Sequence, residues 1–170
     1  MRSRIITFPD VPGLRPTPDR VRETLFNWLG QTLYGRTCLD LFAGSGALGF
    51  EAASRGADRV VMVERNHMVV RVLQDNARKL GYTNIAIYNQ DGIEFASRDK
   101  QRYDVIFLDP PFGSDYLPGL LQVLPQRLNE NGLLYVESGA DIEVPTPWKI
   151  MKSGKAGQVH YKLIGVRNND

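Results

Sequence analysis

The apolar positions near the start of this chain recur at the spacing of a helix face. Residues 18–30 are therefore predicted to form an amphipathic helix that ends at Gly30. Thr17 followed by Pro18 fits an N-cap and a proline at the first helical position. The proline-rich stretch before this helix favours an extended arm over regular structure.

From residue 37 onward, short apolar runs alternate with segments of helical spacing. The strands are apolar on both faces, which is typical of a parallel sheet covered by helices on both sides. After residue 147 the pattern changes and predicts a hairpin of residues 148–151 and 159–166, joined by a loop at 153–157. Earlier strands are predicted at residues 37–41, 60–63, 85–88, 104–108 and 133–136, and helices at 46–55, 66–80, 92–97 and 116–128.

Composition places the chain among ordinary globular proteins, with 42% hydrophobic and 24% charged residues over 170 positions. This length suits a single compact domain, in which an N-terminal arm and helix (1–30) precede the main α/β part (31–170). The one cysteine, Cys38, has no partner for an internal disulfide and falls in a strand expected to be buried. No apolar run approaches the roughly 20 residues of a membrane span and no signal peptide opens the chain, so we expect a cytoplasmic protein.

A glycine-rich loop lies between the first predicted strand and its helix, within residues 39–49. Gly44, Gly46 and Gly49 have the G-x-G-x-x-G spacing, which lets a ligand approach the backbone beyond the strand ends. The next strand ends in Glu64, whose carboxylate can accept hydrogen bonds from both hydroxyls of a ribose. The loop and this carboxylate predict a nucleoside cofactor and leave NAD and S-adenosylmethionine both open.

Two further carboxylates favour S-adenosylmethionine. Asp40 directly precedes the loop, where its charge suits the cationic methionine end of this cofactor and not an anionic pyrophosphate. Asp91 follows the third strand, where it can accept from an adenine amine; it also fits a helix N-cap. The predicted cofactor-binding residues are Asp40, Phe42, Ala43, Gly44, Ser45, Gly46, Glu64, Arg65, Asp91 and Gly92.

The tetrad Asp109-Pro110-Pro111-Phe112 follows the strand at 104–108. Its two prolines fix a carboxylate, a carbonyl and an aromatic ring relative to one another. Hydrogen bonds from an exocyclic base amine to the carboxylate and the first proline carbonyl favour a pyramidal nitrogen with an available lone pair. The ring can stack on the base, which must be flipped out of any helix to reach the site. All four residues are predicted to be catalytic.

The net charge of +2 is too small to indicate a polyanionic partner, but the first 22 residues contain five arginines and only two aspartates. Such a concentration of arginine can act as an electrostatic footprint for phosphates. The alternative is a solvated surface, or arginines that brace the domain through carboxylates such as Glu23. The predicted RNA-binding residues are Arg15, Thr17, Arg20 and Arg22.

These blocks together resemble the RsmD family of bacterial 16S rRNA guanine-N2 methyltransferases. The resemblance implies a class I S-adenosylmethionine-dependent methyltransferase fold. This fold is Rossmann-like, with a seven-stranded, mostly parallel sheet, an antiparallel last strand and helices on both faces. It also implies methylation of guanine 966 of 16S rRNA within the small ribosomal subunit, by a protein that we expect to be a monomer. The matching blocks are residues 13–29, 39–49, 109–112, 136–138 and 155–159.

Three other functions remain open from the residues themselves. The tetrad also serves adenine-N6 methyltransferases, and the glycine spacing is shared with NAD-dependent oxidoreductases. A non-catalytic RNA-binding assembly factor with this fold is the third. His67 and His160 are far apart and have no ligand-spaced partners, so no metal site is predicted.

Overall fold

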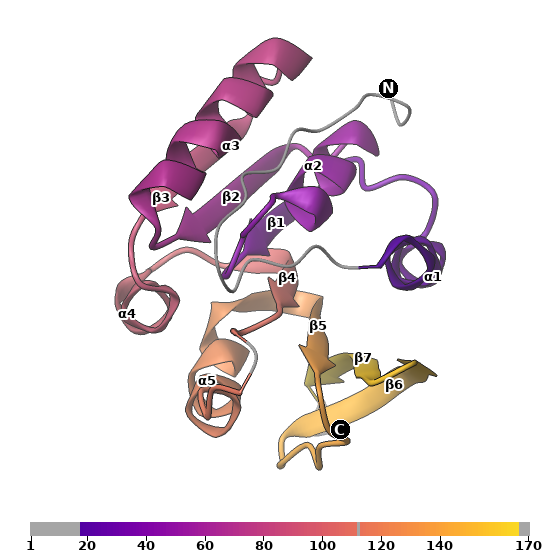
Figure 1. Ribbon diagram of the computed structural model, residues 1–170. Coiled ribbons are helices and arrows are strands. Elements are labelled where there is room, and N and C mark those ends of the chain that lie inside the picture. The colour runs from indigo at the N-terminus through magenta and orange to yellow at the C-terminus, as the bar shows by residue number, and fades with distance from the viewer. Residues whose placement is uncertain (1–17, 112, 167–170) are drawn as a thin grey trace.

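The alternating strands and helices form one sheet with a helical layer on each face (Figure 1). The computed structural model describes residues 18–111 and 113–166. Its strands are β1 (Thr37–Asp40), β2 (Arg59–Glu64), β3 (Ile85–Asn89), β4 (Tyr103–Leu108), β5 (Leu128–Ser138), β6 (Trp148–Ala156) and β7 (Val159–Val166). Its helices are α1 (Asp19–Leu29), α2 (Ala47–Ser54), α3 (His67–Leu80), α4 (Gly92–Arg98), α5 (Leu117–Val123) and the 3₁₀ turn η1 (Leu124–Arg127).

The described residues form a seven-stranded sheet of order β3-β2-β1-β4-β5-β7-β6. The strands from β3 to β5 are parallel, whereas β7 pairs antiparallel with both β5 and β6. The predicted Rossmann-like methyltransferase fold with an antiparallel last strand is therefore confirmed. The order reverses between β1 and β4, and the carboxyl ends at such a switch point form the usual ligand crevice of an open α/β sheet.

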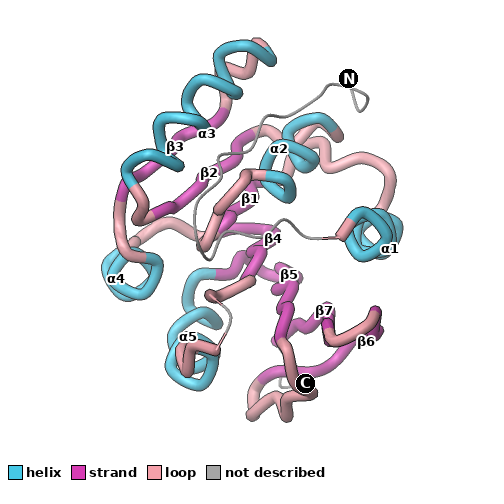
Figure 2. Tube along the Cα trace, viewed as in Figure 1, coloured by secondary structure: helices cyan, strands magenta, loops and turns pink. Residues whose placement is uncertain are grey.

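Two apolar layers hold the helices on the sheet. The helices α1, α2 and α3 cover one face, and α4 and α5 cover the other (Figures 1 and 2). In β4, Val105 and Phe107 pack into the first layer, and Ile106 and Leu108 into the second. The four residues 105–108 are therefore all apolar and buried, as a central strand covered on both sides requires. Cys38 is a buried core residue, as expected, and Trp148 is buried as well.

The predicted element boundaries differ from the structure in several places. The helix expected over 116–128 ends at Val123 and continues as η1, because Pro125 has no N–H for the helical ladder. The strand β5 begins five residues earlier than expected, at Leu128. The helix α1 begins at Asp19, with Pro18 in the extended N-cap position and not at the first helical position.

The predicted loop at 153–157 belongs to β6, which continues to Ala156. A Cβ at Gly154 would lie 2.5 Å from the ring of Tyr161, so this glycine leaves room for the ring within the strand pair. The turn itself is the pair Gly157-Gln158, where Gly157 has a φ of 59°. No helix in the described part of the chain combines the length and the apolar character needed to cross a bilayer.

Candidate active site

The glycine loop turns away from β1 and lies against β2. The Ala43 amide donates to the Val63 carbonyl at 2.9 Å, and the Gly46 amide donates to the Ala43 carbonyl at 2.8 Å. Gly44 and Gly46 have φ values of 54° and 81°, in the left-handed region that favours glycine. The loop therefore presents backbone in place of side chains at these two positions.

Replacing Gly46 with alanine should destabilise the fold by ~2–4 kcal/mol, from the left-handed backbone and from overpacking. A Cβ there would lie 2.6 Å from side-chain atoms of both Leu73 and Phe50. Gly81→Ala is the matched control, since Gly81 has a similar φ of 78° but nothing within 4 Å of a Cβ. Denaturant unfolding of both variants measures the difference; equal losses would show that Gly46 is not tightly packed.

Glu64 is held in place by the backbone around it. Its Oε1 accepts from the Gly44 amide at 3.1 Å, and its Oε2 accepts from the Asn66 amide at 2.7 Å. A carboxylate has about four acceptor positions, so both oxygens retain capacity for ribose hydroxyls. Asn89 fixes the same turn, because its side-chain amide donates to the carbonyls of Glu64 and Arg65 at 3.0 and 2.9 Å. The sequence analysis did not predict the roles of Asn66 and Asn89 at this turn. Their position as polar residues at the ends of two strands could have indicated them.

Asp40 is buried beneath the loop. Its Oδ2 accepts from the Gly49 amide at 3.1 Å, which ties the end of β1 to the first turns of α2. Burial raises the pKa of this carboxyl to about 7; the charges of Glu64 and Glu137 act in the same direction, and the Gly49 amide opposes them. Asp40 therefore stabilises the loop through its hydrogen bond to Gly49. The acidic groups around it favour a cationic ligand.

The third strand end lies against the glycine loop. A Cβ at Gly92 would lie 2.8 Å from the ring of Phe42 and 2.9 Å from the Leu41 carbonyl, so the start of α4 touches the loop. Asp91 caps α4 through Oδ1, which accepts from Ile93 and Glu94 at 2.7 and 3.3 Å. Its N-cap role is thus confirmed, and Oδ2 keeps its acceptor capacity for an adenine amine.

An aromatic wall joins this region to the tetrad. The half-buried ring of Phe42 stacks on Tyr116, with centroids 6.2 Å apart and planes at 13°. Tyr116 is the N-cap residue of α5 and follows the tetrad in the chain. Sequence reasoning missed it. Ser45 and Ala43, also predicted at the cofactor, are buried within the loop, and Arg65 is exposed.

The tetrad begins where β4 ends. The Leu41 amide donates to the Phe107 carbonyl at 3.2 Å, so the β1 and β4 loops leave the sheet side by side. Asp109 is half-buried and Pro110 is buried, whereas Pro111 is exposed. Phe112 lies outside the described residues. The structure therefore brings the predicted carboxylate and first proline next to the predicted cofactor loop.

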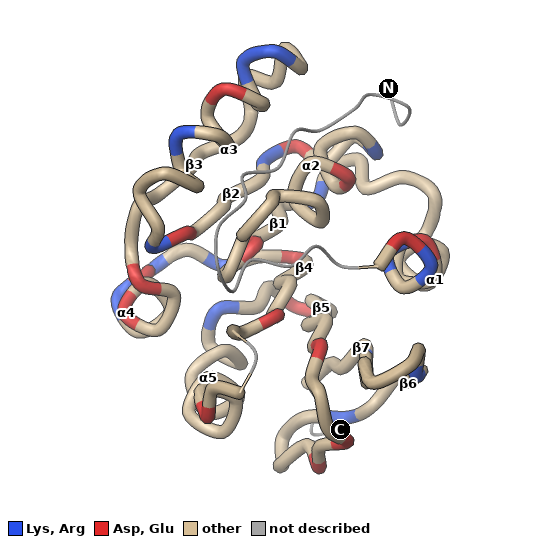
Figure 3. Tube along the Cα trace, in the orientation of Figure 1, with Lys and Arg blue, Asp and Glu red and all other residues tan. Residues whose placement is uncertain are grey.

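A buried carboxylate to which the sequence analysis assigned no role lies beside the tetrad. Glu137, near the end of β5, is 3% exposed and accepts from the Tyr135 hydroxyl at 2.9 Å. Burial raises the pKa of Tyr135, and the charges of Glu137 and Asp109 add to this effect. Glu64, Asp40, Asp109 and Glu137 thus follow the edge in the order β2, β1, β4, β5, and Figure 3 marks acidic positions along it.

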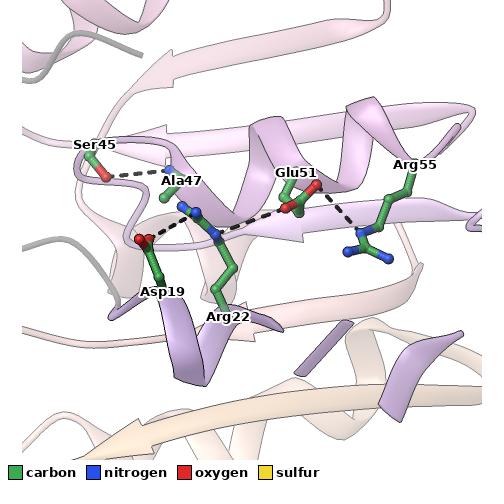
Figure 4. Close-up of polar contacts among 6 residues, drawn as sticks. All are labelled: Asp19, Arg22, Ser45, Ala47, Glu51 and Arg55. Atoms are coloured by element: carbon green, nitrogen blue, oxygen red, sulfur yellow. Dashed lines mark hydrogen bonds and ion pairs between the residues drawn. The ribbon is translucent and has the colours of Figure 1, made fainter. Parts of the chain in front are cut away.

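The predicted RNA-binding arginines differ in their surroundings. Arg22 pairs with Asp19 at 2.9 Å and with Glu51 at 3.9 Å, and Glu51 also pairs with Arg55 at 3.4 Å (Figure 4). Arg22 therefore braces α1 against α2, through Glu51 and not Glu23. Arg20 is exposed on α1. Arg15 and Thr17 lie outside the described residues. Among the described residues, no group of three or more His, Cys, Asp or Glu side chains is arranged to hold a metal.

Comparison with known proteins gives consistent matches over the whole fold. The family model described as conserved hypothetical protein 95 matches residues 1–165. The chain is 40% identical over 167 residues to ribosomal RNA small subunit methyltransferase D of Escherichia coli K12, which covers 95% of this chain and 84% of that protein. A solved structure of a putative methyltransferase from Escherichia coli superposes with a TM-score of 0.85 at 40% identity, covering 95% of this chain and 92% of that one. The Thermus thermophilus 16S rRNA N2 methyltransferase RsmC, solved with AdoMet and guanosine, superposes with a TM-score of 0.74 at 25% identity, covering 90% and 44%.

Proposed function

This chain belongs to the RsmD family of ribosomal RNA small subunit methyltransferases, and from that premise we propose that it methylates the N2 amine of a guanine in 16S rRNA. The chain is an S-adenosylmethionine-dependent methyltransferase of small-subunit rRNA. We further propose that the target base is a guanine, that the methyl group goes to its N2 atom, and that this guanine is the family's position 966. The NAD-dependent alternative loses its basis, because the chain belongs to a methyltransferase family.

The cofactor site fits S-adenosylmethionine. The left-handed backbone at Gly44 and Gly46 shapes the tight turn of the loop, and two backbone amides already orient the Glu64 carboxylate. We assign the ribose to Glu64, the adenine to Asp91 and Gly92 beside Phe42, and the methionine end to the loop above Asp40. When bound, the cofactor supplies an electrophilic methyl group on a sulfonium. The acidic edge stabilises that positive charge.

The observation that carries the proposal is the position of Asp109 and Pro110 directly beside the glycine loop. The lone pair of an exocyclic amine is delocalised into its base, which makes the nitrogen a poor nucleophile. The Asp109 carboxylate and the Pro110 carbonyl each accept one N–H and favour a pyramidal nitrogen. Phe112 is proposed to stack on the base and hold it in line. Catalysis then rests on positioning and electrostatics.

The proposed partner is 16S rRNA within an assembled or assembling small subunit, in the cytoplasm, and we expect the protein to act as a monomer. Arg15, Thr17 and Arg20 are the residues we propose to contact its phosphates. Arg22 is a weaker candidate than Arg20, because Asp19 and Glu51 already neutralise it.

Arg20 and Arg22 provide a matched pair for this assignment. Arg20→Ala should weaken association with small subunits and lower the log–log salt slope by roughly 0.7–0.9, the range for one lost phosphate contact, with an unchanged melting temperature. Arg22→Ala should lower the melting temperature by ~2–4 °C, since it removes a partly exposed brace between α1 and α2. Thermal melts and salt-dependent binding of both variants separate the roles. An unchanged salt slope for Arg20→Ala would remove it from the RNA surface.

Transfer of a labelled methyl group tests the function in vitro. The purified protein should label isolated small subunits given S-adenosylmethionine, and digestion should release the label as N2-methylguanosine. Label in N6-methyladenosine would instead establish the adenine-N6 alternative, which shares the tetrad. Binding to subunits without any label would favour the non-catalytic assembly factor.

A further inference from the structure

Glu137 is a buried carboxylate that the chemistry described so far does not use. It is 3% exposed, and the Tyr135 hydroxyl donates to its Oε2 at 2.9 Å. Tyr135 is itself fully buried, so the donor cannot swing away into solvent. Burying a carboxylate costs free energy unless its oxygens accept hydrogen bonds, and in the ionised form the group is an acceptor only.

The register of the sheet places Glu137 beside the tetrad. Leu108 and Val136 are Cα partners in the parallel pair β4–β5, so the next residues along each strand are Asp109 and Glu137. One step earlier, Phe107 and Tyr135 are partners whose rings make an edge-to-face contact at 6.5 Å. Side chains two residues apart in a strand share a face, so Glu137 projects on the same face as Tyr135.

The charges around these groups place them together at the strand ends. Asp109 contributes to the raised pKa of Tyr135, and Glu137 contributes to the raised pKa of Asp40. Along the sheet edge, Asp109 at the end of β4 lies between Glu137 on β5 and Asp40 on β1. Glu137 is therefore within the reach of a base whose amine is held by Asp109, on the side away from the cofactor loop.

Guanine and adenine differ at that neighbouring edge atom. Next to the N2 amine, guanine presents a second donor, N1–H. Next to the N6 amine, adenine presents N1, which is an acceptor. Two carboxylates side by side therefore match the two adjacent donors of guanine. With adenine, the lone pair of N1 would face a carboxylate oxygen, and two acceptors repel each other.

We propose that Glu137 is a specificity-determining residue that accepts the N1–H of the target guanine while Asp109 and Pro110 hold its N2 amine. Tyr135 is the positioning residue that orients the Glu137 carboxylate through its hydroxyl. This assignment rests on the proposed guanine-N2 activity. It adds the reason why a tetrad shared with adenine enzymes would select guanine in this chain.

The test uses 2-aminopurine, which keeps the 2-amino group but has no N1–H. Small-subunit RNA carrying either guanine or 2-aminopurine at the methylated position is assayed for kcat/KM with the whole protein. The wild type should prefer guanine by ~100-fold or more, because a site built to bond a donor rejects the analogue that lacks it. Glu137→Gln should lower the rate on guanine and raise or retain the rate on 2-aminopurine, since its amide can donate to N1. The guanine preference should then fall to within about tenfold.

Two further variants separate recognition from folding. Tyr135→Phe keeps the carboxylate but removes its donor, and should reduce the guanine preference several-fold with unchanged S-adenosylmethionine affinity. Ser138→Ala is the control on the same strand, because the Ser138 hydroxyl bonds only the Ala140 carbonyl among the described residues, and should leave the preference unchanged.

The outcomes separate the role of Glu137 from the proposed guanine-N2 activity. If Glu137→Gln and Tyr135→Phe lower both rates by the same factor, the preference stays constant and Glu137 is a structural group alone. That result would overturn this assignment and leave the guanine-N2 activity intact. If the wild type methylates neither substrate at the 2-amino group, the proposed function itself fails and this assignment fails with it.

Discussion

Replacing Asp109 with alanine should slow methyl transfer by on the order of 10²–10³-fold or more, while S-adenosylmethionine affinity stays within twofold. The carboxylate is proposed to contact the base amine, and the cofactor is assigned to the β1, β2 and β3 ends. Loss of one of two acceptors would return the amine to its planar, weakly nucleophilic form. Single-turnover kinetics on small subunits, with calorimetric titration of the cofactor, measure both quantities.

Asp109→Asn is the control for this experiment. Its amide oxygen still accepts one N–H, so the variant should retain more activity than Asp109→Ala while having the same size as aspartate. Wild-type turnover by Asp109→Ala would remove the catalytic role of the tetrad. A large loss of cofactor affinity would instead place Asp109 in the cofactor site.

Replacing Glu64 with alanine should weaken S-adenosylmethionine binding by ~1.5–3 kcal/mol, the range for a hydrogen bond to a charged group. The dissociation constant would rise by ~10–150-fold. The loss has two sources, because Glu64 both meets the ribose and accepts from the Gly44 amide of the loop. Calorimetric titration gives the affinity, and Glu94→Ala, an exposed carboxylate on α4, is the control. An affinity within twofold of wild type would exclude Glu64 as the ribose ligand.

The sequence was sufficient for the parts of the site that lie within one motif. The glycine loop, Glu64 and Asp109 each occupy a strand end, and the alternation of strands and helices already implied that those ends share an edge. The described structure places these three groups at that edge. The roles of Arg15, Thr17 and Phe112 stay predictions, since these residues lie outside the described range.

The remaining contacts depend on which strands and helices become neighbours. Glu137 lies beside Asp109 because of the β4–β5 register, which no local pattern encodes. Arg22 pairs with Glu51 because α1 packs against α2. Gly154 was taken for a loop residue because its packing partner, Tyr161, lies on the opposite strand. In each case the contact joins residues that are far apart in the sequence, so the residues around each position did not predict it.

The measurement that tests the central claim most directly is mass analysis of nucleosides from 16S rRNA of the source cells, with and without the gene for this protein. Wild-type rRNA should contain an N2-methylguanosine that is absent without the gene, and wild-type protein should restore it while Asp109→Ala should not. Equal N2-methylguanosine with and without the gene, or loss of N6-methyladenosine in its place, would contradict the account.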